Sequence, residues 1–273
     1  MIASIEHITS LSHPELEPYH TLRRPVEHLQ QGIFVAESGK VVARLLASSI
    51  QPISMLLSDD WYQQFLPMIE ANSSPIKIFV GEKALLESIV GHRLHQSIMA
   101  VGKIPQKIRP TDMLRSSAEN ALYVMADGIT NSENMGVIVR NCVCFNADAL
   151  LVLPSSCDPY LRRSVRNSMG NIFQLPIVYL EDGDADIRRI RSSGIRLYAA
   201  HPQPESMPVG SVRFGARTCI VVGAEGNGIS AQLLDLCDEY VTIPMKEGVD
   251  SLNVASATAV MLWEAMKQQR GTT

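Results

Sequence analysis

Hydrophobic and polar residues alternate along most of this chain in two patterns, one typical of strands and one typical of helices. From about residue 32, short apolar runs rich in branched side chains are each followed by a longer amphipathic stretch. Residues 1–22 mix Pro, His and Glu without a clear period, and we expect a loose arm or a first helix there. In the first third of the chain, strands are predicted at 33–36, 53–57 and 76–80, and helices at 39–48, 61–71 and 82–90. These elements form a compact α/β unit that ends near Val101.

The same alternation resumes after a stretch that contains Pro105 and Pro110, so residues 102–117 predict a linker. Because strands that alternate with helices form a mostly parallel sheet covered on both faces, we predict an α/β fold. Strands are predicted at 122–126, 149–153, 177–180, 196–200, 218–222 and 240–243, and helices at 134–145, 162–169, 185–193, 230–236 and 253–267. The predicted organisation is a domain at 1–104, a basic linker at 105–118 and a larger domain at 119–273.

The composition is that of an intracellular globular protein. With 273 residues, of which 46% are hydrophobic, the chain can bury two cores. It has no uncharged apolar run of about 18 residues, so no membrane span is expected, and its first residues do not predict a secretory signal. Five cysteines, an odd number, favour a reducing cytoplasm. Cys142 and Cys144 would lie on different faces of a helix, so we expect packing thiols and no metal site.

The formal net charge of −4 weakly opposes binding to nucleic acid, which usually requires a basic surface. Basic side chains nevertheless gather locally, and those at i, i+3 and i+4 share one helix face. A solvated helix face is the alternative explanation for any one cluster. The clusters are the linker with Lys103, Lys107, Arg109 and Arg115, a helix with Arg162, Arg163 and Arg166, and a helix with Arg188, Arg189 and Arg191.

A glycine-rich turn, Gly223-Ala-Glu225-Gly226-Asn-Gly228, directly follows the apolar run Ile220-Val-Val. Glycines there allow the backbone to approach a ligand closely and to direct N–H groups toward it. The spacing is G-x-x-G-x-G, which differs from the dinucleotide-binding G-x-G-x-x-G, and no P-loop lysine is present. A plain strand-to-helix turn would also explain these glycines.

Asn134 and Arg140 belong to a second candidate constellation, at the start of a predicted helix. Asn134 is a good N-cap candidate, and Gly136 opens the first turn. Arg140 lies four residues beyond Gly136, within an otherwise apolar helix, so it either forms an internal ion pair or serves a site.

Two further polar groups flank predicted helices. Ser168 and Asn171 follow Arg166 at a helix end, where capping alone would explain them. Ser251 and Asn253 bracket the start of the last long helix. Both are good caps, and both could equally fix a ligand or a reacting hydroxyl.

Four separated motifs carry a specific resemblance across about residues 120–268. Their order and spacing resemble those of the SpoU (TrmH-like) RNA 2′-O-ribose methyltransferases of the SPOUT superfamily. Residues 30–104 resemble the small ribosomal-protein-like RNA-binding domain that often precedes this catalytic domain, with Glu37-Ser38 where the family usually has Glu-Gly and Ser97 after His95-Gln96 where glycine is common. The four motifs are Asn134-x-Gly136-x-x-x-Arg140, Arg166-x-Ser168-x-Gly170, Gly223-x-Glu225-Gly226-x-Gly228, and Ile243-Pro244 with Ser251-Leu252-Asn253-Val254.

The resemblance implies a fold, a cofactor and a set of site residues. The implied fold has a C-terminal trefoil knot that binds S-adenosylmethionine in a bent form, and the implied assembly is a homodimer whose RNA site is shared across the interface. The implied cofactor contacts are near Gly223, Gly228, Ile243 and Leu252. The implied catalytic arginine is Arg140, and the other implied site positions are Asn134, Glu225, Ser251 and Asn253.

These residue types suit methyl transfer, in which the protein mainly positions two reactants. Arg140 is a difficult general base because the pKa of arginine exceeds about 12, so we favour a clamp on the adjacent phosphate and leave the base role open. Arg162, Arg163, Arg166 and the basic linker are candidates for contacts to the RNA backbone. The sequence leaves open whether the substrate is rRNA or tRNA. The alternatives are a non-catalytic RNA-binding or ribosome-assembly factor on the same fold and a nicotinamide-dependent oxidoreductase, which the glycine spacing opposes.

Overall fold

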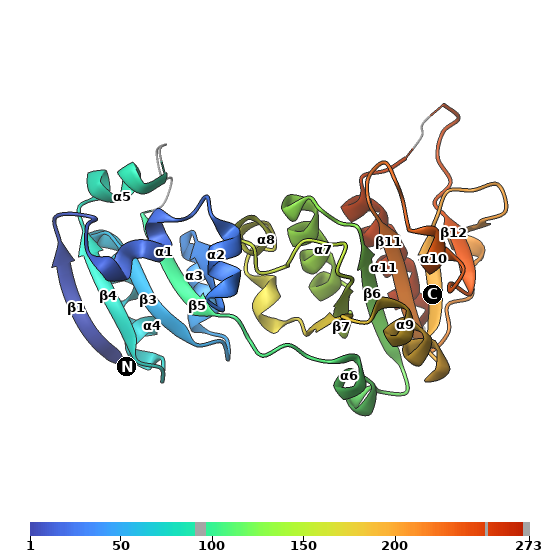
Figure 1. Cartoon of the computed structure of the whole chain (residues 1–273), viewed down its shortest axis with the longest axis horizontal. Coiled ribbons are helices and arrows are strands. Elements are labelled where there is room, and N and C mark those ends of the chain that lie inside the picture. Colours follow the sequence, from blue (N-terminus) through green and yellow to red (C-terminus); the bar gives the residue numbers. More distant parts are fainter. Residues whose placement is uncertain (91–96, 249–250, 270–273) are drawn as a thin grey trace. The chain divides into compact units, whose positions relative to one another are not determined.

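The computed structural model describes residues 1–90, 97–248 and 251–269, which form two compact units (Figure 1). The first unit comprises residues 1–106 and 160–174, and the second comprises residues 107–159 and 175–273. His95, Gln96 and Asp250 lie outside the described residues. The assignment of residues 1–104, 105–118 and 119–273 to two domains and a linker stays a prediction.

The first unit is built on a mixed five-stranded sheet with the order β1-β4-β3-β5-β2. Strands β1 and β3 are parallel to β4, whereas β5 is antiparallel to both β3 and β2. The strands are β1 (Ile2–Ile8), β2 (Ile33–Glu37), β3 (Pro52–Leu57), β4 (Ile76–Gly81) and β5 (Ile98–Lys103). The helices are η1 (Pro14–Leu16), α1 (Glu17–His20), α2 (Pro25–Gln30), α3 (Gly39–Leu46), α4 (Asp59–Ala71), α5 (Lys83–Val90), α8 (Arg162–Asn167) and η2 (Asn171–Gln174).

The prediction of a loose arm or a first helix over residues 1–22 is correct only in part, because η1 and α1 are short helices there but Ile2–Ile8 form β1, an edge strand of this sheet. Its residues pair with β4 from Ile2 opposite Ile76 to Ile8 opposite Gly81. Side chains along β1 alternate between partly buried and exposed, as expected when only one face of a strand is covered. Such an edge strand lacks the continuous apolar run that revealed β2, β3 and β4.

Residues 160–174 belong to the first unit although they lie far from it in the sequence. The Phe34 ring packs against the rings of Tyr160 and Phe173, with centroids 5.4 Å apart in each pair. The buried carboxylate of Glu37 accepts hydrogen bonds from Arg162 at 2.7 Å and from Arg166 at 3.0 Å. Two of the three arginines proposed from the sequence to contact RNA are therefore engaged within this unit.

The second unit is built on a seven-stranded sheet with the order β10-β12-β9-β11-β6-β7-β8, in which every pair of strands is parallel. The prediction of a mostly parallel sheet is confirmed. The strands are β6 (Ala121–Asp127), β7 (Ala149–Val152), β8 (Ile177–Tyr179), β9 (Arg196–Ala200), β10 (Met207–Pro208), β11 (Arg217–Gly223) and β12 (Glu239–Thr242). The helices are α6 (Pro110–Ser116), α7 (Ser132–Cys144), α9 (Gly183–Ser192), η3 (Val209–Ser211), α10 (Ala231–Leu234) and α11 (Val254–Gln269).

Helices cover both faces of this sheet. On one face, α11 packs against α7 and β11 (Figure 1). On the other, Met113 of α6, Ile187 of α9 and Leu233 of α10 join the buried cluster that includes Tyr123 and Met125 of β6. The stretch expected to form a linker therefore contains a helix that contributes to the core. No helix in the described part of the chain is long and apolar enough to cross a membrane.

Candidate active site

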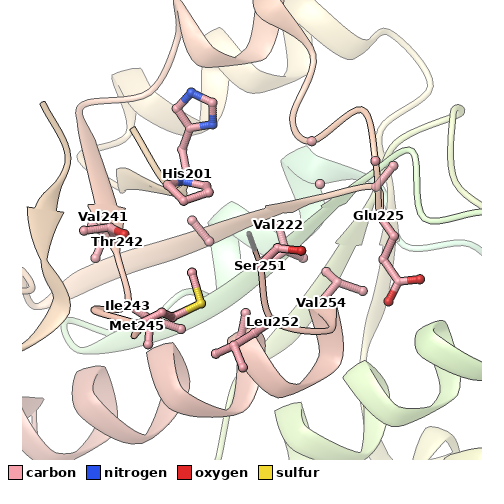
Figure 2. Close-up of a pocket in the computed structure, with 17 residues that line it drawn as sticks. His201, Val222, Glu225, Val241, Thr242, Ile243, Met245, Ser251, Leu252 and Val254 are labelled. Carbon is pink, nitrogen blue, oxygen red and sulfur yellow. The ribbon is translucent and has the colours of Figure 1, made fainter. Parts of the chain in front are cut away.

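A cavity of about 410 Å³ lies at the carboxyl ends of β9, β11 and β12 in the second unit (Figure 2). Loops after the carboxyl ends of parallel strands are the usual position of ligand sites in open α/β sheets. The predicted residues Gly223, Glu225, Gly228, Ile243, Ser251 and Leu252 all line it. Three separate segments of the chain thus form one site.

The glycine turn is a tight loop whose conformation requires glycine. Ala224 and Gly228 pair through two backbone hydrogen bonds of 3.0 and 2.9 Å. A Cβ atom on Gly223 would lie 2.2 Å from the carbonyl carbon of Gly228, so no side chain fits there. Gly226 has a φ of 101° and Gly228 a φ of 68°, in the region that favours glycine. The close approach at Gly223 is therefore to the loop's own backbone.

Asn253 connects three of the predicted site positions. Its Nδ2 donates to Asn134 Oδ1 at 3.0 Å and to Glu225 Oε1 at 2.6 Å. Its Oδ1 accepts from the backbone N–H groups of Ala255 at 3.0 Å and Ser256 at 3.3 Å, which caps α11. One amide side chain therefore fixes the start of the helix and orients the Glu225 carboxylate at the edge of the cavity.

The prediction that Asn134 caps its helix is wrong. The N-cap of α7 is Asn131, whose side chain accepts from the N–H of Glu133 at 2.8 Å. Asn134 lies inside the first turn, where its amide oxygen is directed to Asn253 instead. Both asparagines favour caps, so sequence alone gave no means of choosing between them.

The walls of the cavity are mostly apolar. In Figure 2, Ile243, Met245 and Leu252 gather along one side, with His201 opposite them. Leu252 is 39% exposed, which is unusual for leucine and leaves its side chain available to a ligand. Such a lining suits a ligand with a flat apolar part and a few polar groups at its edge.

His201 and Thr242 are lining residues that the sequence reasoning missed. His201 directly follows β9, and Thr242 is the last residue of β12. Both strands were predicted, and residues at the carboxyl ends of parallel strands meet at one edge of the sheet. That rule would have found both residues.

Asp127, another residue missed from the sequence, ties the neighbouring loops together at the end of β6. Its buried carboxylate accepts from Ser155 Oγ at 2.8 Å and from the N–H of Ser230 at 2.7 Å. Buried carboxylates of this kind are stable only when hydrogen-bonded. Asp127 therefore holds the loops after β7 and β11 in a fixed arrangement.

Arg140 does not line the cavity. Its side chain is exposed on α7, and it makes no ion pair or hydrogen bond with any residue that the structure describes. Its neighbour Asn141 donates to the carbonyl of Ala255 at 2.7 Å and so ties α7 to α11. The alternative of an internal ion pair for Arg140 therefore has no support in the described part of the chain.

The remaining predicted positions lie in the first unit. Arg162 and Arg166 are paired with Glu37, whereas Arg163 is exposed. Ser168 is the C-cap of α8, and Asn171 accepts from Arg44 at 2.8 Å. Capping therefore accounts for Ser168, whereas Asn171 is explained by its hydrogen bond to Arg44.

Four of the five cysteines, all except the exposed Cys144, have raised thiol pKa values, which opposes a role as nucleophile. Cys142 and Cys219 are buried, and burial raises the pKa of both thiols. Burial also raises the pKa of Cys157 to about 11 and that of Cys237 to about 12. Among the described residues, no group of three or more His, Cys, Asp or Glu side chains could hold a metal ion.

Comparison with known families agrees with this arrangement. Residues 121–263, which include every lining residue of the cavity, match the family model described as the SpoU rRNA Methylase family. The chain belongs to the SpoU rRNA methylase family. Its β6–α11 unit, with the glycine loop and the Asn134–Asn253–Glu225 cluster, is thus a SpoU domain.

Relatives match over nearly the whole chain. The chain is 28% identical over 271 residues to an uncharacterized tRNA/rRNA methyltransferase of Mycobacterium tuberculosis, covering 95% of this chain and 91% of that protein. It is 26% identical over 211 residues to the 23S rRNA (guanosine-2′-O-)-methyltransferase RlmB of Escherichia coli, covering 76% and 86%. The structure of an AdoMet-bound rRNA methyltransferase from Sinorhizobium meliloti superposes with a TM-score of 0.83 at 22% identity, covering 98% and 99%, which shows a shared fold.

Proposed function

We propose that this SpoU-family protein is an S-adenosylmethionine-dependent methyltransferase that modifies a ribose 2′-hydroxyl in rRNA or tRNA. The observation that carries the proposal is the cavity with the Asn134–Asn253–Glu225 cluster at its edge. The similarity to RlmB of Escherichia coli, named as a guanosine-2′-O-methyltransferase, supports the type of reaction.

The residues of the cavity fit the proposed cofactor. Ile243 and Leu252 offer apolar surface for an adenosine, and the glycines of the loop Gly223–Gly228 bring backbone groups to the wall of the cavity. Glu225 adds negative charge next to the site, which suits a ligand that carries a sulfonium and an ammonium group. When bound, S-adenosylmethionine supplies the methyl group that is transferred.

The reacting ribose needs to be held in line with that methyl group, and its hydroxyl needs to lose a proton. Glu225, oriented by Asn253, is the carboxylate at the edge of the cavity and meets the ribose in this proposal. Ser251 lines the same cavity and has a hydroxyl that can donate or accept. Together they position the nucleophile.

Arg140 acts as a clamp on the phosphate beside the reacting ribose. An exposed guanidinium without a partner among the described residues is available for a bidentate contact to phosphate. Because a guanidinium keeps its proton in proteins, arginine stabilises developing negative charge more readily than it removes a proton.

The proposed assembly is a homodimer, so that Arg140 and the cavity can serve an RNA shared between two subunits. Trp263 is 53% exposed and Val260 is 38% exposed, both on α11. The Trp263 ring contacts that of Phe145, at the end of α7, with centroids 6.2 Å apart. An exposed aromatic side chain on a face that combines two helices is typical of a protein interface.

The proposal also includes a C-terminal knot and an RNA-binding role for the N-terminal residues. In the sheet, β12 lies on the far side of β9 from β11. After β12 the chain returns to α11, which packs against β11 and α7, and this return supports a C-terminal trefoil knot. Residues 1–104 form the RNA-binding domain in this proposal. Exposed Arg163 and the basic stretch 105–118 contribute contacts to the RNA backbone.

The decisive experiment compares wild type with Arg140→Ala. Ribose-methylation mapping of rRNA and tRNA in a deletion strain identifies the target nucleotide, and each variant is then supplied in trans. We expect Arg140→Ala to bind S-adenosylmethionine like wild type in calorimetry and to lose methylation. Arg188→Ala removes an exposed arginine from α9 and is the matched control. Wild-type methylation by Arg140→Ala would refute the assignment of Arg140, and a wild type that binds no cofactor would favour the non-catalytic alternative.

A further inference from the structure

A second cavity, of about 190 Å³, lies at the carboxyl ends of β7 and β8. It is lined by Lys107, Leu153, Asp158, Tyr179 and Glu181, among others, and shares no residue with the first cavity. All of its lining residues belong to the second unit. No step of the proposed reaction uses it.

The two cavities lie on the same edge of the parallel sheet. The strand register pairs Val222 of β11 with Ala126, Ala126 with Val152, and Val152 with Tyr179 of β8. Three steps between neighbouring strands correspond to about 14 Å. A short stretch of RNA whose ribose lies at Glu225 can therefore extend to the second cavity.

The lining of this cavity matches a planar heterocycle with polar groups on its edge. Its inner wall is apolar, formed by Val152, Leu153 and Leu180, while Asp158 and Glu181 provide carboxylates. Carboxylates only accept hydrogen bonds, so the edge of the ligand has to donate. Its volume is below the roughly 300–1,000 Å³ of sites for drug-sized ligands, which suits a single base better than a whole nucleotide.

Tyr179 offers the cavity an aromatic surface whose position is fixed. Its hydroxyl donates to Asp158 Oδ2 at 3.1 Å, which holds both side chains in place. The ammonium of Lys107 lies 5.1 Å from the centroid of the Tyr179 ring and 2.9 Å from Glu181 Oε1. The Lys107 ammonium therefore already lies over the face of the Tyr179 ring.

A stacked base competes well with Lys107 for that ring face. The Lys107–Glu181 pair is exposed on both sides, and such a pair contributes at most about fivefold to an equilibrium. Stacking of a base on an aromatic side chain contributes about 5- to 150-fold. Displaced from the ring, Lys107 remains close enough to neutralise a phosphate of the same RNA strand.

We propose that this cavity binds a nucleobase with N–H donors on its edge, guanine above all, in the RNA strand whose ribose is methylated. Guanine presents adjacent ring and exocyclic N–H groups that one carboxylate, Asp158, can accept together. Uracil lacks the exocyclic donor. The inference rests on the proposed function, since it requires that the protein binds RNA at this edge of the sheet.

The test measures the affinity of the full chain for four fluorescein-labelled pentanucleotides, UUUUU, UUGUU, UUAUU and UUCUU, by fluorescence anisotropy at low salt. Reading one base through hydrogen bonds to its edge is expected to favour UUGUU over UUUUU by about 5- to 150-fold. Asp158→Asn should abolish that preference, because an amide presents only one acceptor oxygen. Tyr179→Leu should weaken all four complexes, whereas Tyr179→Phe, which keeps the ring and loses only the hydrogen bond to Asp158, should weaken them less.

Asp182→Asn is the matched control, since it removes the same charge at the N-cap of α9, outside the lining of the cavity. The proposal is overturned if wild type binds the four oligonucleotides equally or binds none of them, or if Asp158→Asn keeps the preference for guanine. Calorimetry with S-adenosylmethionine on the same samples separates the two ideas. Intact cofactor binding with no base preference refutes this inference alone, whereas absence of cofactor binding refutes the proposed function.

Discussion

Asn253 makes two separable contributions, and Asn253→Asp distinguishes them. The side-chain oxygen caps α11 through the N–H groups of Ala255 and Ser256, while the side-chain nitrogen holds Glu225 at 2.6 Å and Asn134 at 3.0 Å. Aspartate is as good an N-cap as asparagine, but it has no N–H to donate. The substitution therefore preserves the helix start and removes the contact that orients Glu225.

The two contributions differ in size. Loss of an N-cap costs about 1 kcal/mol of stability, which Asn253→Ala should lose and Asn253→Asp should keep. A hydrogen bond to a charged group contributes about 1.5–3 kcal/mol. Two carboxylates 4 Å apart repel by about 1 kcal/mol in water and about 4 kcal/mol at an effective dielectric of 20. With Glu225 displaced, we expect Asn253→Asp to lower kcat/KM by about 10- to 150-fold. This range corresponds to a loss of about 1.5–3 kcal/mol of transition-state stabilisation, the contribution of one charged hydrogen bond.

Urea unfolding and methylation of the mapped target RNA provide the two measurements. Both variants lose the contact with Glu225, so the difference between them isolates the cap, and Asn253→Asp should be about 1 kcal/mol more stable than Asn253→Ala once Glu225 is displaced. Lowering the pH should restore part of its activity, because protonation of one carboxylate relieves the repulsion. Wild-type kcat/KM in Asn253→Asp would refute the role assigned to Glu225, and equal destabilisation of the Asp and Ala variants would refute the capping argument.

Three further predictions concern other parts of the chain. Ser38 has a φ of 83° and a ψ of 145°, a conformation that costs any residue other than glycine about 1–3 kcal/mol. Because glycine also loses more backbone entropy on folding, Ser38→Gly should raise the free energy of unfolding by a net of about 1 kcal/mol. An unchanged urea midpoint would contradict this prediction. Burial lowers the pKa of His28 from 6.5, so the folded state binds fewer protons than the unfolded state and stability falls as the pH drops below that value. His28→Gln should lose less stability than wild type between about pH 7.5 and 5.5, a window set by the ordinary histidine pKa. Trp263→Glu should convert the proposed homodimer to monomer in sedimentation, and a persistent dimer would place the interface elsewhere.

Sequence patterns located most elements because most strands are buried on both faces. Continuous apolar runs revealed β6, β7, β9 and β11, and the alternation with helices correctly indicated a parallel sheet. The pattern failed at β1, because its apolar residues Ile2, Ala3, Ile5 and Ile8 form neither a continuous run nor a regular alternation. It also gave no sign that residues 160–174 belong with the first unit, because that depends on contacts such as Glu37 with Arg162 and Arg166.

Motif order and spacing were enough to identify the family and the segments of the candidate site, because they can be recognised without knowing the path of the chain in space. The sequence supplied Asn134, Glu225 and Asn253 as separate polar positions. Only the tertiary structure decided that one amide nitrogen joins the other two, that Asn131 rather than Asn134 caps α7, and that Arg140 lies outside the cavity. The Asn134–Asn253 hydrogen bond joins residues 119 positions apart, so it depends on how the sheet orders its strands, and local pattern carries no information about that order.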